Sequence, residues 1–193
     1  MKVIEHRINL PSTEPITPYA EIDVQLGERG LFLVRHDITD SGPYLFQYLR
    51  ESKHESFLVN VKQSLSITHL SRLIEEMGDR LIGLFDVPWP LMYYASNSNY
   101  PVYCRISQYE PPNWLTCKYW LDPLGFEEPG TYNVLYEVIR ETQAYNEIMV
   151  CCPSLHHYEL DKCKEVWEWM KDKEQIQGIV TKYAEECREY FNA

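Results

Sequence analysis

The residues best placed to do chemistry form a short polar segment after an apolar run. The run LFLVR (31–35) predicts a buried strand. The loop that follows it begins with His36, whose imidazole can transfer protons near neutral pH, and Arg35 can bind oxyanions. In α/β sheets, ligands bind where the carboxyl end of a strand opens into a loop. We therefore predict a ligand site at residues 36–43. The binding candidates are Asp37, Asp40, Ser41, Gly42 and Asp86, which follows another apolar run.

Three apolar runs separated by helix-like segments must position this loop. Residues 31–35, 57–61 and 81–85 are rich in Val, Leu, Ile and Phe, which is typical of strands buried on both faces. The segment between the first two runs is long enough for a crossover helix, so we expect those strands to be parallel neighbours. The alternation in 20–26 predicts an edge strand, and the spacing in 66–77 predicts a helix ended by a glycine. Together they predict a three-layer, doubly wound, mainly parallel α/β sheet.

The rest of the chain is expected to complete one α/β domain, residues 1–193. Residues 86–130 hold seven of the twelve prolines and break the alternation, which is typical of an insertion with a binding or packing role. A helical pattern over 131–145 and an apolar run at 147–152 then extend the sheet. From 159 to 193, apolar stripes at helical spacing predict a C-terminal helical segment.

The aromatic side chains of residues 86–130 are candidates for a protein interface, because Trp and Tyr are enriched at such surfaces. The interface candidates are Trp89, Trp114 and Trp120. The alternative is that these rings cover the sheet, since most aromatics of a domain are buried.

Charge and composition argue against several classes of function. The formal net charge of −11 and the absence of any basic run argue against nucleic-acid binding. No apolar run is long enough to span a membrane and the first residues lack a signal-peptide core, so we expect a cytoplasmic protein without membrane contact. The six cysteines lack the spacing of a disulfide framework and are expected to be reduced.

Over residues 25–85, GERGLFLVRHDITDSGPYLFQYLRE and FLVNVKQSLSITHLSRLIEEMG resemble the front half of the RecA-type ATPase core. The similarity is to KaiC/RadA-like proteins and to the motif-less ring subunits of the Elongator complex. It places a P-loop, G-x-x-x-x-G-K-[ST], at this loop. With Gly42 as the second glycine, the motif is degenerate, because Asp37, Pro43 and Tyr44 replace the first glycine, the lysine and the magnesium-binding hydroxyl.

The strand that should end in a magnesium-binding Asp ends instead in Cys151 and Cys152. The resemblance therefore implies a RecA-like pseudo-ATPase without a cofactor. Such a domain would act as a structural or regulatory subunit, holding protein partners in a homo- or hetero-oligomer.

Two alternatives use the same loop. LVRH (33–36) resembles the L-x-R-H-G signature of the histidine phosphatases, although Asp37 replaces the glycine. That resemblance implies a phosphotransfer or hydrolytic enzyme in which Arg35 clamps the phosphoryl group and His36 accepts it. The second alternative is a domain that senses a small ligand in the same cleft.

A short segment after the run at 147–152 concentrates possible zinc ligands. These are Cys152, His156, His157 and Cys163. Their spacing is not that of a structural zinc site, and adjacent cysteines on a strand point to opposite faces. We therefore expect a buried strand end and a polar loop here, without a metal.

Overall fold

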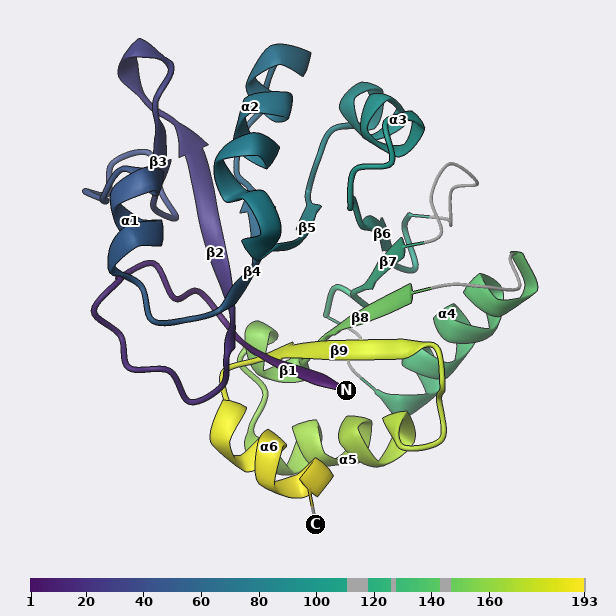
Figure 1. The fold of residues 1–193 in the computed structure, drawn as a ribbon. Helices are drawn as coiled ribbons and strands as arrows, with labels where there is room; N and C mark the ends of the chain where they lie inside the picture. Colours follow the sequence, from purple (N-terminus) through teal and green to yellow (C-terminus); the bar gives the residue numbers. More distant parts are fainter. Residues whose placement is uncertain (111–117, 126–127, 143–146, 193) are drawn as a thin grey trace. The chain divides into compact units, whose positions relative to one another are not determined.

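The computed structural model describes residues 1–110, 118–125, 128–142 and 147–192 (Figure 1). The chain forms two compact units: unit 1 comprises Met1–His6 and Tyr103–Ala193, and unit 2 comprises Arg7–Val102. Among the helices of the described residues, none is both long enough and apolar enough to cross a bilayer.

Unit 1 is a parallel sheet with helices along one face (Figure 1). Its strands lie in the order β1 (Lys2–Glu5), β9 (Ile176–Thr181), β8 (Glu147–Cys151), β7 (Lys118–Leu121) and β6 (Cys104–Ile106). The helices are α4 (Pro129–Thr142), α5 (Leu160–Met170) and α6 (Ala184–Asn192), and the 3-10 turn η3 (Pro153–His156) follows β8. The buried apolar residues of these strands, such as Ile148, Val150 and Ile179, form the core of the unit with Trp167 of α5.

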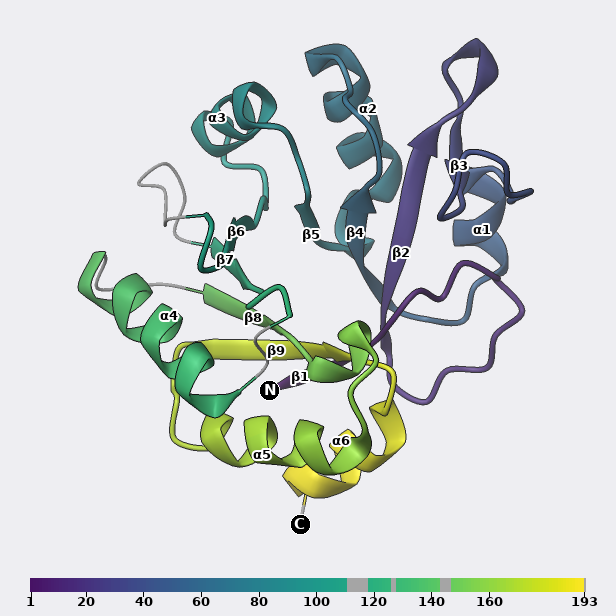
Figure 2. The same ribbon diagram turned by 180° about the vertical axis from the view of Figure 1, so that it is seen from behind.

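Unit 2 repeats the alternation of parallel strands and helices. Strands β2 (Tyr19–Leu26), β4 (Ser56–Val61) and β5 (Leu81–Phe85) are parallel neighbours in that order, and β3 (Phe32–Val34) pairs with β2 in the antiparallel sense. The helices are α1 (Leu45–Glu51), α2 (Ile67–Met77) and α3 (Trp89–Asn97), with 3-10 turns η1 (Glu28–Gly30) and η2 (Gly78–Arg80). Figure 2 shows α1 beside β3 and α2 beside β4.

The sequence patterns located several of these elements correctly. Strands β4 and β5 match the runs at 57–61 and 81–85, and α2 ends at Gly78, which has a positive φ of 53°. The pairing predicted for 31–35 is wrong. Only a short turn joins β2 to β3, too short for the crossover that a parallel pair needs, so β3 returns antiparallel beside β2. The partner of β4 is β2 instead, the segment expected at an edge.

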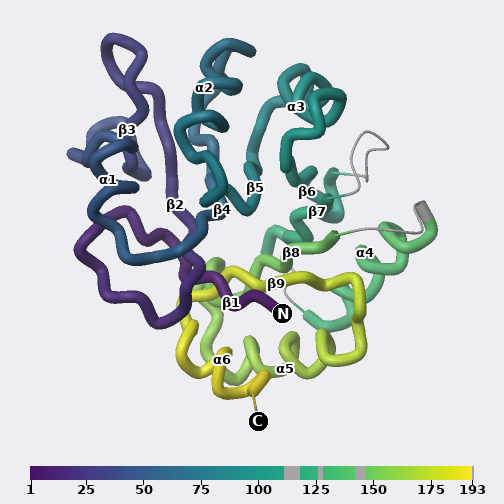
Figure 3. Tube along the Cα trace, in the orientation of Figure 1, coloured from purple at the N-terminus to yellow at the C-terminus, as the bar shows by residue number. Residues whose placement is uncertain are grey.

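The doubly wound arrangement is also wrong. In such a sheet the strand order reverses at a switch point, whereas β2, β4 and β5 in unit 2 and β6 to β9 in unit 1 follow one another in chain order. Within unit 1, β1 pairs with β9, so the first strand of the chain lies beside the last (Figure 3). An open, doubly wound sheet of the RecA type does not join its first and last strands.

The segment from 159 to 193 differs from its predicted helical form. Strand β9 separates α5 from α6 and lies between β1 and β8. The residues read as a helical stripe, Ile176, Ile179 and Val180, are buried in the sheet, and β-branched side chains suit that setting.

Candidate functional site

The most unusual feature of unit 2 is a row of buried polar side chains on β2. Glu21, Asp23 and Gln25 alternate along the strand and share one face, and they are 2%, 1% and 5% exposed. Between them, Ile22 and Val24 are buried apolar residues. Burying charged groups is costly unless they are paired and hydrogen-bonded. The two carboxyl groups therefore mark a place where the fold supplies compensating partners.

Those partners come from the segment before β2 and from the end of β4. The backbone N–H of Arg7 donates to Glu21 Oε2 at 2.8 Å, and Arg7 Nε lies 3.5 Å from Asp23 Oδ2. Asn9 holds Asp23 twice, because its Nδ2 donates to Oδ2 and its Oδ1 accepts from the Asp23 backbone N–H, both at 2.9 Å. Lys62 Nζ lies 3.8 Å from Asp23 Oδ1. Asp23 is thus surrounded by cationic and amide groups.

Glu21 is the less compensated of the two carboxyl groups. Burial, with the neighbouring Asp23 charge, raises the pKa of Glu21 from 4.5 to about 8, although the Arg7 N–H and the Arg7 and Lys62 charges oppose the rise. The group therefore holds a proton at neutral pH unless a further cation arrives.

Strand β4 adds an oxygen atom to the same face. The parallel register places Asn60 opposite Asp23. Within the described part of the chain, Asn60 Oδ1 is buried and accepts no hydrogen bond, which costs free energy that a bound cation would return. Glu21, Asp23 and Asn60 together offer the all-oxygen ligands that Mg²⁺ or Ca²⁺ prefers.

His36 approaches this group from the loop after β3. Its Nε2 lies 3.4 Å from Lys62 Nζ, and its Nδ1 lies 3.0 Å from Asp37 Oδ1. Because an ammonium group only donates, Nε2 accepts from Lys62 and the ring proton sits on Nδ1, facing Asp37. The Gln25 side chain holds the His36 carbonyl oxygen at 2.6 Å. The His36 ring is therefore oriented with its unprotonated Nε2 toward Lys62.

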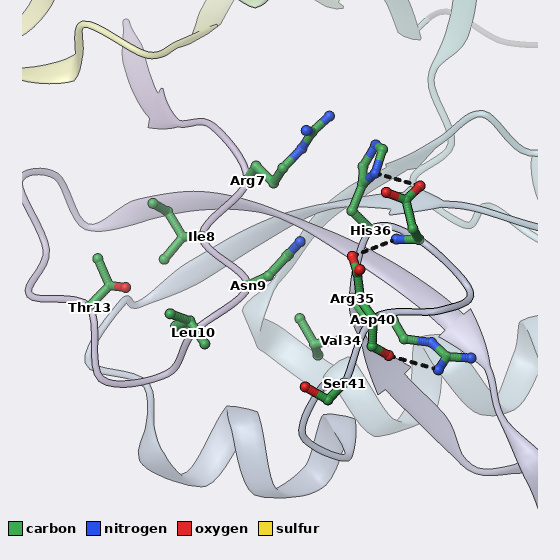
Figure 4. Close-up of a pocket in the computed structure, with 11 residues that line it drawn as sticks. Arg7, Ile8, Asn9, Leu10, Thr13, Val34, Arg35, His36, Asp40 and Ser41 are labelled. Carbon is green, nitrogen blue, oxygen red and sulfur yellow. Dashed lines mark hydrogen bonds and ion pairs between the residues drawn. The ribbon is translucent and has the colours of Figure 1, made fainter.

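We call Arg7, Asn9, Glu21, Asp23, His36, Asn60 and Lys62 the β2 cluster. A pocket of about 540 Å³ opens beside it, between the segment before β2 and the loop after β3. Figure 4 shows Arg7 and His36 extending to the same side of this pocket. The lining residues are Arg7, Ile8, Asn9, Leu10, Thr13, Val34, Arg35, His36, Asp37, Asp40 and Ser41.

The loop residues selected from the sequence divide into two groups. Asp37, Asp40 and Ser41 line the pocket, and the Asp37 backbone N–H donates to Asp40 Oδ2 at 3.0 Å. Gly42 has a steric role, because a Cβ there would lie 2.2 Å from the Val34 carbonyl oxygen. The Arg35 guanidinium donates to Gln25 Oε1 and to the Asp40 carbonyl oxygen, so it secures the loop.

The remaining candidates lie elsewhere. Asp86 follows β5 with a positive φ of 58° and does not line this pocket. Among the interface candidates, Trp89 is 56% exposed, Trp120 is buried at 2%, and Trp114 lies outside the described residues.

The cysteine and histidine candidates of unit 1 separate into two places. Cys152 lies against Cys163; burial opposes its ionisation, but hydrogen bonds involving Cys163, Ser154 and Thr181 hold its pKa at about 6. His156 lies instead with Cys151 and Asp122. His157 lines a small pocket beside His156.

The chain resembles known proteins in its fold alone. No family model matches it, and no curated protein matches it either. Its fold, however, is similar to that of solved phosphodiesterases and is TIM-barrel-like. A glycerophosphodiester phosphodiesterase from Agrobacterium tumefaciens superposes with a TM-score of 0.66 at 14% identity, covering 100% of this chain and 99% of that one. One from Parabacteroides distasonis gives 0.56 at 16% identity, covering 99% and 96%.

These likenesses overturn three predictions. The chain has neither the RecA/KaiC-like fold nor a degenerate P-loop, since its neighbours are TIM-barrel-like. The pseudo-ATPase function rested on that fold and falls with it. The histidine phosphatase alternative is wrong as well, because the fold is different and Arg35 is held by Gln25 and Asp40 instead of facing His36.

Sequence reasoning missed most of the β2 cluster. Glu21 and Asp23 were seen only as the polar positions of an alternating strand. Asn60 was seen only as part of the apolar run 57–61, and Lys62 only as the residue after it. The available signal was that two acids occupied one face of a strand whose other face was wholly apolar. His36 was selected, but with Arg35 as its partner instead of Lys62.

Proposed function

We propose that this chain hydrolyses phosphodiesters of the glycerophosphodiester type, with the β2 cluster as its reaction centre. The observation that carries the proposal is the convergence of Arg7, Lys62 and His36 on the buried Glu21–Asp23 pair beside an open pocket. The structural neighbours are glycerophosphodiester phosphodiesterases, which suggests the substrate class, and in TIM barrels active sites lie at the carboxyl ends of strands. Lys62 follows the last residue of β4, at that end.

The charges of the cluster suit a phosphodiester, which carries one negative charge shared by two oxygen atoms. Arg7, 47% exposed on its side chain, can present two N–H groups to those oxygens, and Lys62 can contact them as a point charge. Asp23 holds both cations and so sets where the phosphate group binds.

The reaction itself needs a proton acceptor and a proton donor. The oxygen of a water molecule bonds to phosphorus, the ester P–O bond breaks, and the leaving alkoxide takes up a proton. When Lys62 turns from His36 to the phosphate oxygens, His36 Nε2 is free to accept the proton of the water and then to return it to the alkoxide. Asp37 holds the ring and stabilises it when it is charged.

A hard divalent cation fits the remaining atoms of the cluster. Glu21, Asp23 and Asn60 Oδ1 would hold it, and when bound it would stabilise charge on the phosphoryl oxygens. The rest of the pocket suits the alcohol part of the substrate, since Asn9, Thr13 and Ser41 line it with hydrogen-bonding groups.

The test is hydrolysis of glycerophosphoethanolamine and of bis(p-nitrophenyl) phosphate, with Mg²⁺ or Ca²⁺ added. We expect His36→Ala to lower kcat about 10²- to 10⁴-fold, the range for losing a general acid–base group. His69→Ala is the matched control, because His69 lies on α2 and interacts with Ser66 at the start of that helix. Wild-type protein that hydrolyses neither substrate, or a His36→Ala variant within threefold of wild type, would refute the proposal.

A further inference from the structure

Unit 1 contains a second group of metal-ligating side chains, which the proposed reaction does not use. Asp122 follows the last residue of β7, Cys151 is the last residue of β8, and His156 ends the turn η3 that follows β8. Because β7 and β8 are parallel neighbours, their carboxyl ends lie at the same edge of the sheet. We call these three residues the β7–β8 cluster.

The ligand atoms of the cluster are already close together. His156 Nε2 lies 2.9 Å from Asp122 Oδ1 and 3.6 Å from Cys151 Sγ, and all three atoms lie within 4.8 Å of one another. Tetrahedral zinc with ordinary bond lengths would place its sulfur and nitrogen ligands about 3.5 Å apart and its nitrogen and oxygen ligands about 3.3 Å apart. The S–N separation fits as it stands, and the N–O separation needs a shift of about 0.4 Å.

The carboxylate is held in place by groups other than His156. Trp120 Nε1 donates to Asp122 Oδ2 at 3.3 Å, and the Leu124 backbone N–H donates to Oδ1 at 3.2 Å. Arg105 Nε lies 4.0 Å from Oδ2. Hydrogen bonds of this kind orient metal ligands and preserve their geometry when the ion leaves.

The cluster is accessible from one side. The Asp122 side chain is 7% exposed and Cys151 is 1% exposed, whereas the His156 side chain is 29% exposed and lines a pocket of about 490 Å³ with Leu155, His157 and Tyr158. An ion can therefore enter at His156, and a fourth ligand from solvent can approach from the same pocket. Three protein ligands with an open fourth position describe a reactive zinc site more closely than a closed structural one.

We propose that Asp122, Cys151 and His156 bind a zinc ion with one coordination position open to the pocket. The mixed sulfur, nitrogen and oxygen donors select zinc over Mg²⁺ or Ca²⁺, which prefer oxygen alone. The thiol of Cys151 gives up its proton to solvent when the ion binds, so the thiolate and the Asp122 carboxylate balance its two positive charges.

The test is zinc binding to the full chain in the Glu21→Gln, Asp23→Asn background, which removes the oxygen ligands of the β2 cluster. We expect one zinc ion per chain by competition with a chromophoric chelator, with affinity at least tenfold weaker in His156→Ala and in Cys151→Ser. Cobalt in place of zinc should give a near-ultraviolet thiolate-to-metal band that Cys151→Ser abolishes. Cys187→Ser, another buried cysteine, is the matched control and should change neither reading.

Absence of zinc binding at micromolar concentration, an unchanged affinity in His156→Ala, or a cobalt spectrum without the thiolate band would overturn the proposal. Far-ultraviolet circular dichroism checks folding of each variant. Should Cys151→Ser not fold, the partly exposed His156 and the cobalt spectrum of the background protein still decide the question. Because the background removes the β2 ligands, failure of zinc binding leaves the phosphodiesterase proposal standing, and failure of hydrolysis leaves the zinc proposal standing.

Discussion

The β2 cluster of unit 2 and the β7–β8 cluster of unit 1 are built from the same kinds of elements. Each draws on neighbouring parallel strands and on the loop that follows a strand. They differ in their partners: the acids of the β2 cluster face Arg7 and Lys62, whereas Asp122 faces the imidazole of His156 and the sulfur of Cys151 lies beside it. One arrangement is suited to an anionic substrate and the other to a soft metal ion. The positions of the two clusters follow from the parallel strands, and the difference in what they can bind follows from their side-chain atoms.

The largest difference between the clusters should appear in stability when the central acid is removed. Asp23→Ala leaves Arg7, Lys62 and Asn9 without their shared partner, so we expect the free energy of unfolding in urea to fall by about 3–5 kcal/mol. Asp122→Ala should cost only about 1–3 kcal/mol, because its close ion pair is with the single imidazole of His156, whereas Asp23 holds two cationic side chains and an amide.

Asp79→Ala, at an exposed acid in η2, is the control and should stay within about 0.5 kcal/mol of wild type. An Asp122→Ala variant that loses as much stability as Asp23→Ala would remove the distinction between the two clusters.

The second expected effect is a pH dependence that comes from Glu21. Its pKa in the folded chain is about 8, above its ordinary 4.5, because burial disfavours the charged form. The folded state therefore holds a proton that the unfolded state has lost, so this group stabilises the fold fully below pH 4.5 and ceases to do so as the pH rises through 8. One proton sets a limit of about 1.4 kcal/mol per pH unit on this slope.

Thermal melts between pH 5 and 8 measure that slope. We expect the melting temperature to fall across this range in wild type and to fall less in Glu21→Gln, which cannot ionise. Equal slopes in the two proteins would show that folding does not raise the pKa of Glu21.

The smallest expected effect concerns Asn60. Asn60→Leu removes a buried oxygen that accepts no hydrogen bond from any described residue, so in the presence of a chelator the variant should gain about 1 kcal/mol. The same change removes a cation ligand. Mg²⁺ or Ca²⁺ at millimolar concentration should therefore raise the melting temperature of wild type but not of Asn60→Leu.

Asn192→Leu, at the exposed end of α6, is the control and should respond to cations as wild type does. A cation response that survives in Asn60→Leu would place the ion elsewhere.

Local patterns predicted local structure well and pairing poorly. The spacing in α2, its glycine stop and the apolar runs of β4, β5 and β8 are properties of neighbouring residues, and these were located correctly. Which strand lies beside which depends on distant segments. The alternation of β2 predicted an edge strand, yet β2 pairs with both β3 and β4 and carries the acids of the site.

The sequence located only part of the candidate site, because the rest depends on which strands pair. His36 stands out as a histidine at the end of an apolar run, and the structure places it in the site. Its partner Lys62 and the oxygen of Asn60 come from β4, and only the register of β2 with β4 brings them together. Arg35 was selected because it is adjacent in sequence, but its side chain turns to Gln25.

The close approach of Gly42 to the Val34 carbonyl oxygen limits how the loop after β3 can vary through evolution. Any larger residue at position 42 would push apart the two backbone segments that bring His36 to Lys62. Substitutions could alter the pocket lining at Asp40 or Ser41 and so change which alcohol is accepted, while position 42 stays glycine. Among folded variants from a saturation library across this loop, we therefore expect many residue types at Asp40 and Ser41 and almost only glycine at position 42.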